Sequence, residues 1–127
     1  MHREFTAEVE QFLQQHIESL AQLEALLLLR RDPAREWEAA DLAKALYSSA
    51  DVCAGLLKDL HRRGFLQIST PTDRYRYGPT DANLDRLVGE VDQIYQQRRV
   101  AVITFIYSKP VSNVQTFADS FRLRREK

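Results

Sequence analysis

Hydrophobic positions recur at three- and four-residue steps along most of this chain, and this spacing predicts a mainly helical protein. The first such stripe occupies residues 6–18, and a run of leucines continues the pattern over residues 20–30. Ser19 and Gln22 have the spacing of a capping box, so a new helix is expected to begin there. Pro33 should end it, because proline disfavours the helical conformation of the residue before it.

The centre of the chain has two short helical patterns joined by a polar turn and followed by two alternating segments. The helices are expected at 39–46 and about 50–63, and the strands at 65–69 and 74–77. Gly64 follows the second helix, where a left-handed residue is needed. A short edge strand is expected at 35–37, with Trp37 in the core. This order predicts a winged helix-turn-helix with a small β wing.

After the wing, Pro79 should interrupt regular secondary structure, and Asp81 should cap a long helix. The apolar run at 100–107 fits either a helix or a buried strand. A continued helix is favoured, because residues 96–99 contain no turn residue that would interrupt it. A last helix is expected at 111–125.

At 127 residues, the chain is interpreted as one winged-helix domain. Its parts are an N-terminal helix (1–18), the winged helix-turn-helix core (19–80) and C-terminal helices (81–127). The lone Cys53 fits a small core residue in a reducing compartment, with a reactive thiol as the alternative. No signal peptide or membrane span is visible, so a cytoplasmic protein is expected.

Several motifs together resemble small bacterial winged-helix transcription regulators of the MarR type. They are LLLLRRDP (26–33), the helix-turn-helix, GFL (64–66), YRY (75–77) and FADSFR (117–122). The resemblance implies a winged helix whose additional terminal helices serve dimerisation. The chain departs from the pattern at Glu38, where a Ser or Thr cap is expected, and in its weakly basic second motif helix.

The second motif helix carries Val52, Leu56, Leu57 and Leu60 at helical spacing, and Cys53 with the three leucines is expected to face the core. Ser48 and Asp51 have capping-box spacing. The candidate DNA contacts are polar or basic side chains directed outward from this helix or from the wing: Ser49, Lys58, Arg62, Arg74 and Arg76. Asp59, on the edge of this face, should repel phosphate, and for the wing arginines a merely solvated strand face is the alternative.

The terminal helices leave apolar surfaces that a winged-helix unit does not need, which favours a homodimer. The expected interface consists of apolar side chains at both ends of the chain: Phe5, Val9, Phe12, Leu13, Ile17, Val102, Phe105, Ile106, Phe117 and Phe121. The alternative is a monomer whose N-terminal helix folds onto the last two helices.

Formal net charge is zero, with acidic residues in excess over 1–47 and basic ones over 48–127. The scattered histidines and the absence of a glycine-rich phosphate loop argue against an enzyme, a metal site or a cofactor. Two functions stay open. One is a homodimeric, sequence-specific regulator on double-stranded DNA; the other is a winged-helix module that binds a protein partner.

Overall fold

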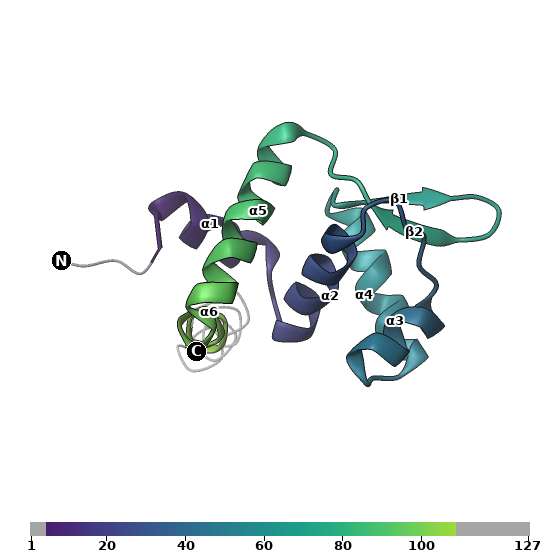
Figure 1. Ribbon diagram of the computed structural model, residues 1–127, viewed down its shortest axis with the longest axis horizontal. Coiled ribbons are helices and arrows are strands. Elements are labelled where there is room, and N and C mark those ends of the chain that lie inside the picture. Colours follow the sequence, from purple (N-terminus) through teal and green to yellow (C-terminus); the bar gives the residue numbers. More distant parts are fainter. Residues whose placement is uncertain (1–4, 109–127) are drawn as a thin grey trace, which may run out of the picture.

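The computed structural model describes residues 5–108, which form a mainly helical winged helix with one two-stranded sheet (Figure 1). The helices are α1 (Ala7–His16), α2 (Leu20–Arg31), α3 (Ala39–Leu46), α4 (Ala50–Arg62), α5 (Ala82–Gln97) and α6 (Arg99–Ser108), and the strands are β1 (Leu66–Ser69) and β2 (Arg74–Tyr77). The expected fold class is confirmed. The last helix expected, at 111–125, lies outside the described residues.

Side-chain caps define where most of these helices begin. In four of them a side-chain oxygen accepts a hydrogen bond from the backbone N–H three residues later, and the four caps are Thr6, Ser19, Ser49 and Asp81. The expected capping box at α2 is modified, because the Gln22 side chain accepts from the N–H of Glu18 at 2.6 Å rather than from Ser19. At α3, the N–H of Glu38 donates to the Asp41 carboxylate at 3.0 Å.

The wing is the antiparallel pair β1–β2, with Leu66 opposite Tyr77 and Ser69 opposite Arg74. Trp37 exchanges two backbone hydrogen bonds with Tyr75, at 2.7 and 2.9 Å, so the expected edge strand is a single bridge. The Trp37 side chain is buried as expected, and the Arg35 guanidinium lies over its ring at 3.6 Å. Gly64 has φ +93°, which confirms the left-handed residue after α4.

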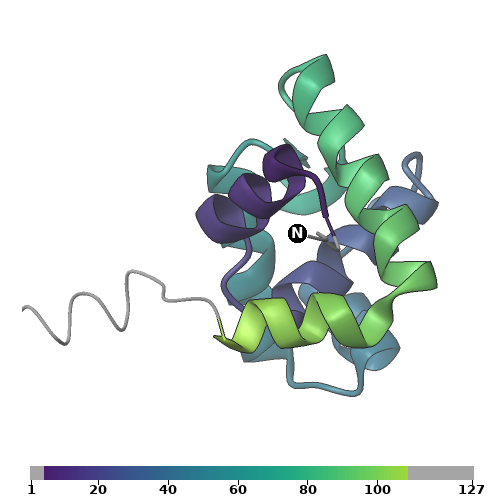
Figure 2. The ribbon, with the colours of Figure 1, turned by 90° about the vertical axis from the view of Figure 1, so that its left-hand side faces the viewer.

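Residues 99–108 are helical, as favoured, but α5 does not continue into α6. The break is at Arg98, with φ −135° and ψ 56°, and Figure 2 shows that the two helices run in different directions. The sequence prediction of an uninterrupted helix is wrong here. The turn brings Phe105 of α6 against Phe5, which lies just before α1, and their rings meet edge to face at 5.7 Å. It also lets Val102 and Ile106 become buried.

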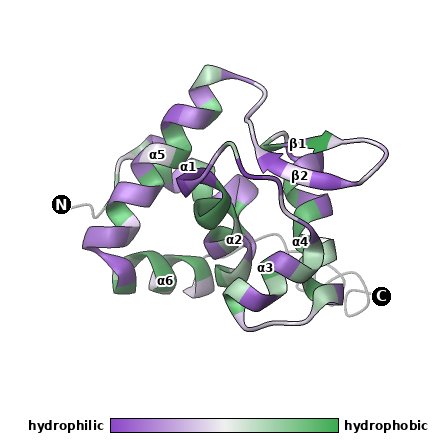
Figure 3. Cartoon of the chain, turned by 45° about the vertical axis from the view of Figure 1, so that its right-hand side comes forward, coloured by the Kyte–Doolittle hydropathy of each residue, from purple (hydrophilic) through white to green (hydrophobic). Residues whose placement is uncertain are grey.

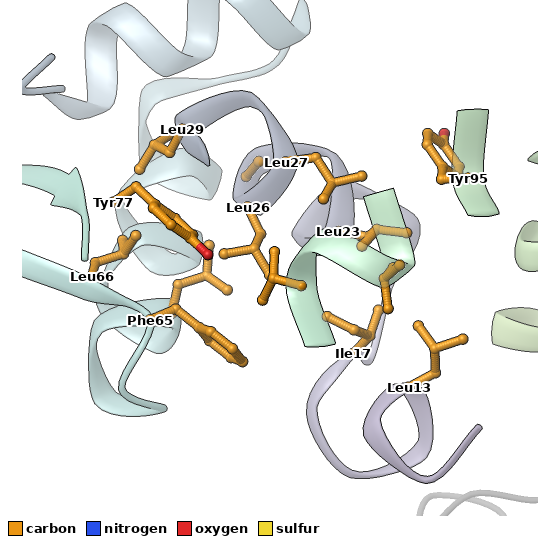
Figure 4. Close-up of a cluster of buried hydrophobic side chains, with 14 of the residues drawn as sticks. Leu13, Ile17, Leu23, Leu26, Leu27, Leu29, Phe65, Leu66, Tyr77 and Tyr95 are labelled. Carbon is orange, nitrogen blue, oxygen red and sulfur yellow. The ribbon is translucent and has the colours of Figure 1, made fainter. Parts of the chain in front are cut away.

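Helix α2 lies at the centre of the core. Its side chains Leu23, Leu26, Leu27 and Leu29 have almost no exposed surface. Figure 4 shows them surrounded by side chains from α1, α5 and the start of the wing, among them Leu13, Ile17, Phe65, Leu66, Tyr77 and Tyr95. Ala21, Glu24, Leu28 and Arg31 form a stripe that is exposed or partly buried, and the surrounding elements cover most of the rest of α2.

The apolar side chains assigned to a dimer interface are mostly core residues of one chain. Seven are at most 5% exposed: Phe5, Val9, Phe12, Leu13, Ile17, Val102 and Ile106. Phe105 is partly buried, and Phe117 and Phe121 lie outside the described residues. This corrects the expectation for the seven, because helices of the same chain already cover their surfaces. A second copy would have to use other residues.

Within residues 5–108, no helix combines the length and the apolar character needed to cross a membrane.

Candidate nucleic-acid interface

The helix-turn-helix and the wing lie together at one end of the molecule, and α1, α5 and α6 lie at the other (Figures 1 and 3). Helix α3 packs against α4, and both pack against α2. Between α3 and α4, Tyr47 takes the left-handed conformation with φ 55°, and its side chain is 96% exposed. Ser48 N–H donates to the carbonyl of Ala43 at 2.9 Å, which closes the turn. The start of α4 is therefore held rigidly at a corner of the protein.

Helix α4 buries Cys53, Leu57 and Leu60 and exposes the opposite face, broadly as expected. Val52 is the exception, because it is 53% exposed although its spacing grouped it with the core leucines. Successive residues of a helix are about 100° apart, so Val52 lies well to one side of Cys53, which marks the centre of the buried face. The exposed face of the first two turns accordingly carries Asp51, Val52, Gly55 and Lys58.

Ser49 lies at the start of this exposed face and caps α4. Its hydroxyl oxygen accepts from the N–H of Val52 at 3.1 Å, while the hydroxyl proton stays free to be donated to a ligand. The capping box expected between Ser48 and Asp51 does not form, because the cap is one residue further along the chain. Asp51 is exposed and makes no ion pair with any residue in the range 5–108.

Near the other end of α4, the Asp59 carboxylate accepts hydrogen bonds from three side chains. The Arg63 Nε donates to its carboxylate at 2.8 Å, and Arg62 and the buried Gln22 also donate to it. Burial lowers the pKa of Arg63, but the hydrogen bond and the charge of Asp59 outweigh this effect and raise it overall. Arg63 also reaches Glu18 at 2.8 Å. Asp59 was expected to repel phosphate, yet Arg62 and Arg63 compensate its charge. The exposed Arg62 is therefore partly engaged by Asp59 and less available to a ligand.

The wing presents its arginines outward and its tyrosines inward, as expected. Tyr75 and Tyr77 are buried, and burial together with a hydrogen bond to Asp85 raises the pKa of Tyr77, whose hydroxyl donates to Asp85 at 2.7 Å. Arg74 pairs with Glu38 at 3.0 Å. Arg76 is exposed and has no acidic partner within the described part of the chain. The two wing arginines are therefore not equivalent.

Among the five candidate contacts, Lys58 and Arg76 combine exposure with a charge that no described residue neutralises. Sequence reasoning missed three further exposed side chains at this end, namely Lys44 on α3, Tyr47 and Val52. A stricter helical projection centred on Cys53 would have found Val52. The exposure of Tyr47 follows from its left-handed backbone, and no local sequence pattern predicts that conformation.

Other chemistry has little support in the described residues. No three His, Cys, Asp or Glu side chains between residues 5 and 108 gather where they could hold a metal ion. Cys53 is fully buried on the inner face of α4, which confirms its reading as a core residue.

No protein-family model matches the sequence, and comparison with curated proteins finds no match either. Solved structures do share the fold. The chain is similar to MepR, a transcription regulator of the Staphylococcus aureus multidrug efflux pump MepA, with 21% identity, 94% of this chain and 87% of that chain covered, and a TM-score of 0.53. It is similar to a mutant of MarR from E. coli with 12% identity, coverage of 94% and 86%, and a TM-score of 0.51.

A third similar structure is a complex of S. aureus MepR with DNA, with 21% identity, 94% of this chain and 85% of that chain covered, and a TM-score of 0.52. Because all these identities are low, the similarity establishes a shared fold. The chain has the winged-helix fold of MarR-type regulators, and the resemblance drawn from its motifs is confirmed at that level.

Proposed function

We propose that this protein is a transcription regulator that binds double-stranded DNA in a sequence-specific manner as a homodimer. The observation that carries the proposal is the exposed first turn of α4, lying at one end of the molecule with the unpaired cations Lys58 and Arg76. A rigid exposed helix start beside a basic wing suits a major groove and its flanking backbone. The DNA complex of MepR, which shares this fold, supports the proposal.

In this arrangement, α4 enters the major groove with its first turn toward the base edges. Lys58 and Arg76 contact phosphates, and the Ser49 hydroxyl donates to one. Arg62 and Arg74 contribute less, because each must first give up the carboxylate that it holds, Asp59 and Glu38 respectively. The proposal therefore predicts modest electrostatic affinity, in keeping with a net charge of zero.

The homodimer part of the proposal rests on surface that one chain leaves uncovered. On α6, Val100 is 75% exposed and Tyr107 is 69% exposed, and Figure 3 shows that this helix is hydrophobic along most of its length. A two-fold pairing through α6 would cover these side chains and place two copies of α4 on one duplex. Half-sites would then be about 34 Å apart, one turn of DNA.

A protein partner is the second candidate function, and the exposed apolar side chains at the helix-turn-helix favour it. Tyr47 and Val52 both project from the face assigned to DNA. Aromatic and aliphatic side chains of this kind also anchor protein interfaces.

Binding to fluorescent duplexes during a salt titration tests the proposal. For a dimer with four phosphate contacts, log affinity should fall against log salt with a slope of about −3.6. Lys58→Ala and Arg76→Ala should each flatten the slope and weaken binding on every duplex. Arg86→Ala, a control at an exposed arginine of α5, away from the helix-turn-helix and from α6 (Figure 1), should change neither quantity. Wild-type protein that binds no duplex at low salt would favour the protein partner instead.

A further inference from the structure

We propose that the first turn of α4 reads pyrimidine bases, with Val52 contacting the methyl group of a thymine and Asp51 accepting a hydrogen bond from the amino group of a neighbouring cytosine. This inference rests on the proposed DNA binding and adds the base preference. It follows from the chemistry of two adjacent exposed side chains, neither of which was a candidate DNA contact in the sequence.

Val52 is an apolar side chain that the fold leaves in water. It is 53% exposed, while Cys53 and Leu57 on the same helix are fully buried. Its backbone N–H is held by the Ser49 cap, and a β-branched side chain in a helix has one strongly preferred rotamer. Its methyl groups therefore point in a fixed direction. In the major groove, the apolar group that a base edge offers is the C5-methyl of thymine.

Asp51 restricts the neighbouring base in a different way. Its carboxylate is exposed and unpaired within residues 5–108, and an ionised carboxylate only accepts hydrogen bonds. Inside the groove it needs a donor, because the N7 and O6 acceptors of guanine would repel it. Cytosine presents its N4 amino group, whereas the N6 amino group of adenine stands beside the N7 acceptor. Cytosine is thus the base that Asp51 fits best.

The two readings are compatible in space. Asp51 and Val52 are consecutive, so they differ by about 1.5 Å along the helix axis and about 100° around it. In the proposed arrangement, the two side chains contact the edges of adjacent base pairs. The first turn also lacks an arginine or lysine, the side chains that read guanine most often, since its exposed residues are Ala50, Asp51 and Val52. A half-site with thymine next to cytosine is the expected target.

The test starts with iterative selection from a random-sequence duplex library by the wild-type protein. Enriched duplexes should carry adjacent thymine and cytosine in each half-site. Deoxyuridine is then placed at the thymine of one half-site, which removes only the methyl group. Wild-type affinity should fall about fourfold, the value of one buried methyl-sized group. Val52→Ala should bind the thymine and deoxyuridine duplexes equally well.

Asp51→Asn provides the second arm. An asparagine amide both donates and accepts, and it pairs in bidentate fashion with adenine, so the preferred base should change from cytosine to adenine by about fivefold or more. Gln93→Ala is the control, because Gln93 is exposed on α5, at the end of the molecule away from α4 and outside the proposed α6 pairing surface (Figure 1). Thermal unfolding of each variant reports whether it is folded.

The outcomes separate the two proposals. No enriched sequence from the library would overturn both DNA binding and base reading. A second outcome is an enriched sequence for which Val52→Ala still binds the thymine duplex more tightly than the deoxyuridine duplex and Asp51→Asn still prefers cytosine. This outcome would overturn the base reading and leave DNA binding standing. Enrichment of half-sites that carry no adjacent thymine and cytosine on either strand would also overturn it.

Discussion

The carboxylate of Asp92 on α5 lies 3.1 Å from Nη1 of Arg30 on α2, and Asp92 is only 6% exposed. Gln96 also donates to this carboxylate, at 3.2 Å, so its charge is compensated inside the protein. Gly89 makes the approach of Arg30 possible, because a Cβ atom there would lie 2.8 Å from Nη2 of Arg30. The pair fixes α5 against the central helix, behind the wing.

Two glycines in helices should therefore respond differently to alanine. Gly55 on α4 has open space around the position of a Cβ, so Gly55→Ala should raise the free energy of unfolding by about 0.5–1 kcal/mol through helix propensity. Gly89→Ala should give no such gain, because the new methyl group displaces the guanidinium from Asp92. Urea unfolding measures both variants. Replacing Arg30 with Met should restore the gain at Gly89, and an equal gain for both glycines in the wild-type background would contradict the assignment.

His16 should make stability depend on pH. Its ring packs against Phe12 and Phe65 at 5.2 and 5.4 Å, and its Nδ1 is buried without a hydrogen-bond partner in the described structure. Burial lowers its pKa, and the charge of Arg63 lowers it further. The unfolded chain therefore binds the proton more readily than the folded one. The stabilisation from neutral His16 is complete above about pH 6.5 and is lost as the pH falls below that value.

His16→Leu should remove this contribution. Urea unfolding of both proteins between about pH 7.5 and 5 should show wild-type stability falling more steeply than that of the variant. Parallel curves would mean that His16 does not titrate differently on folding. Carboxylates such as Glu8, whose pKa is lowered mainly by its hydrogen bond with Arg86, are common to both proteins and cancel in the comparison.

Tyr47 should be a site where glycine stabilises the fold. A non-glycine residue at φ 55° is in the disfavoured left-handed region, and the exposed ring has little packing to lose. Tyr47→Gly should raise the free energy of unfolding by up to about 1 kcal/mol, after subtraction of the extra freedom of glycine in the unfolded chain. Tyr47→Ala keeps the Cβ atom and serves as the control. A gain for alanine equal to that for glycine would assign the effect to the ring instead of the backbone.

Local signals predicted the elements of this fold well. Gly64 marked the end of α4, Asp81 the start of α5, and the alternation at 74–77 the inward tyrosines. The break at Arg98 has no local signal, because the residues that α6 packs against after the turn, such as Phe5, are far away in the sequence. The same reason explains the apolar stripe of α1: periodicity shows that a face must be covered, but not whether its own chain or a second copy covers it.

The candidate site was predictable only in outline, because local patterns give the direction of a side chain but not its distant partners. The direction of Arg76 follows from strand alternation, but the pairing of Arg74 with Glu38 joins residues far apart in the sequence. Arg62 could have been suspected, since Asp59 lies three residues before it on the same helix. The exposure of Val52 depended on where the centre of the buried face lies, and a periodic pattern with four apolar residues leaves that centre uncertain by one position.

The pairing of Arg74 yields the last prediction, which concerns the salt dependence of DNA binding. Arg76→Ala removes one phosphate contact from each protomer, so the slope of log affinity against log salt should become shallower by about 1.8 for a dimer. Arg74→Ala should change it less, because Glu38 already holds that guanidinium at 3.0 Å. Glu38→Gln should do the opposite: it frees Arg74 for phosphate, steepens the slope and tightens binding at low salt. The Glu38–Arg74 pair is half exposed and contributes little to stability, so the variant should stay folded. Fluorescence anisotropy over a salt titration measures all three variants, and equal slopes for Arg74→Ala and Arg76→Ala would show that the pairing does not restrain Arg74 at the DNA.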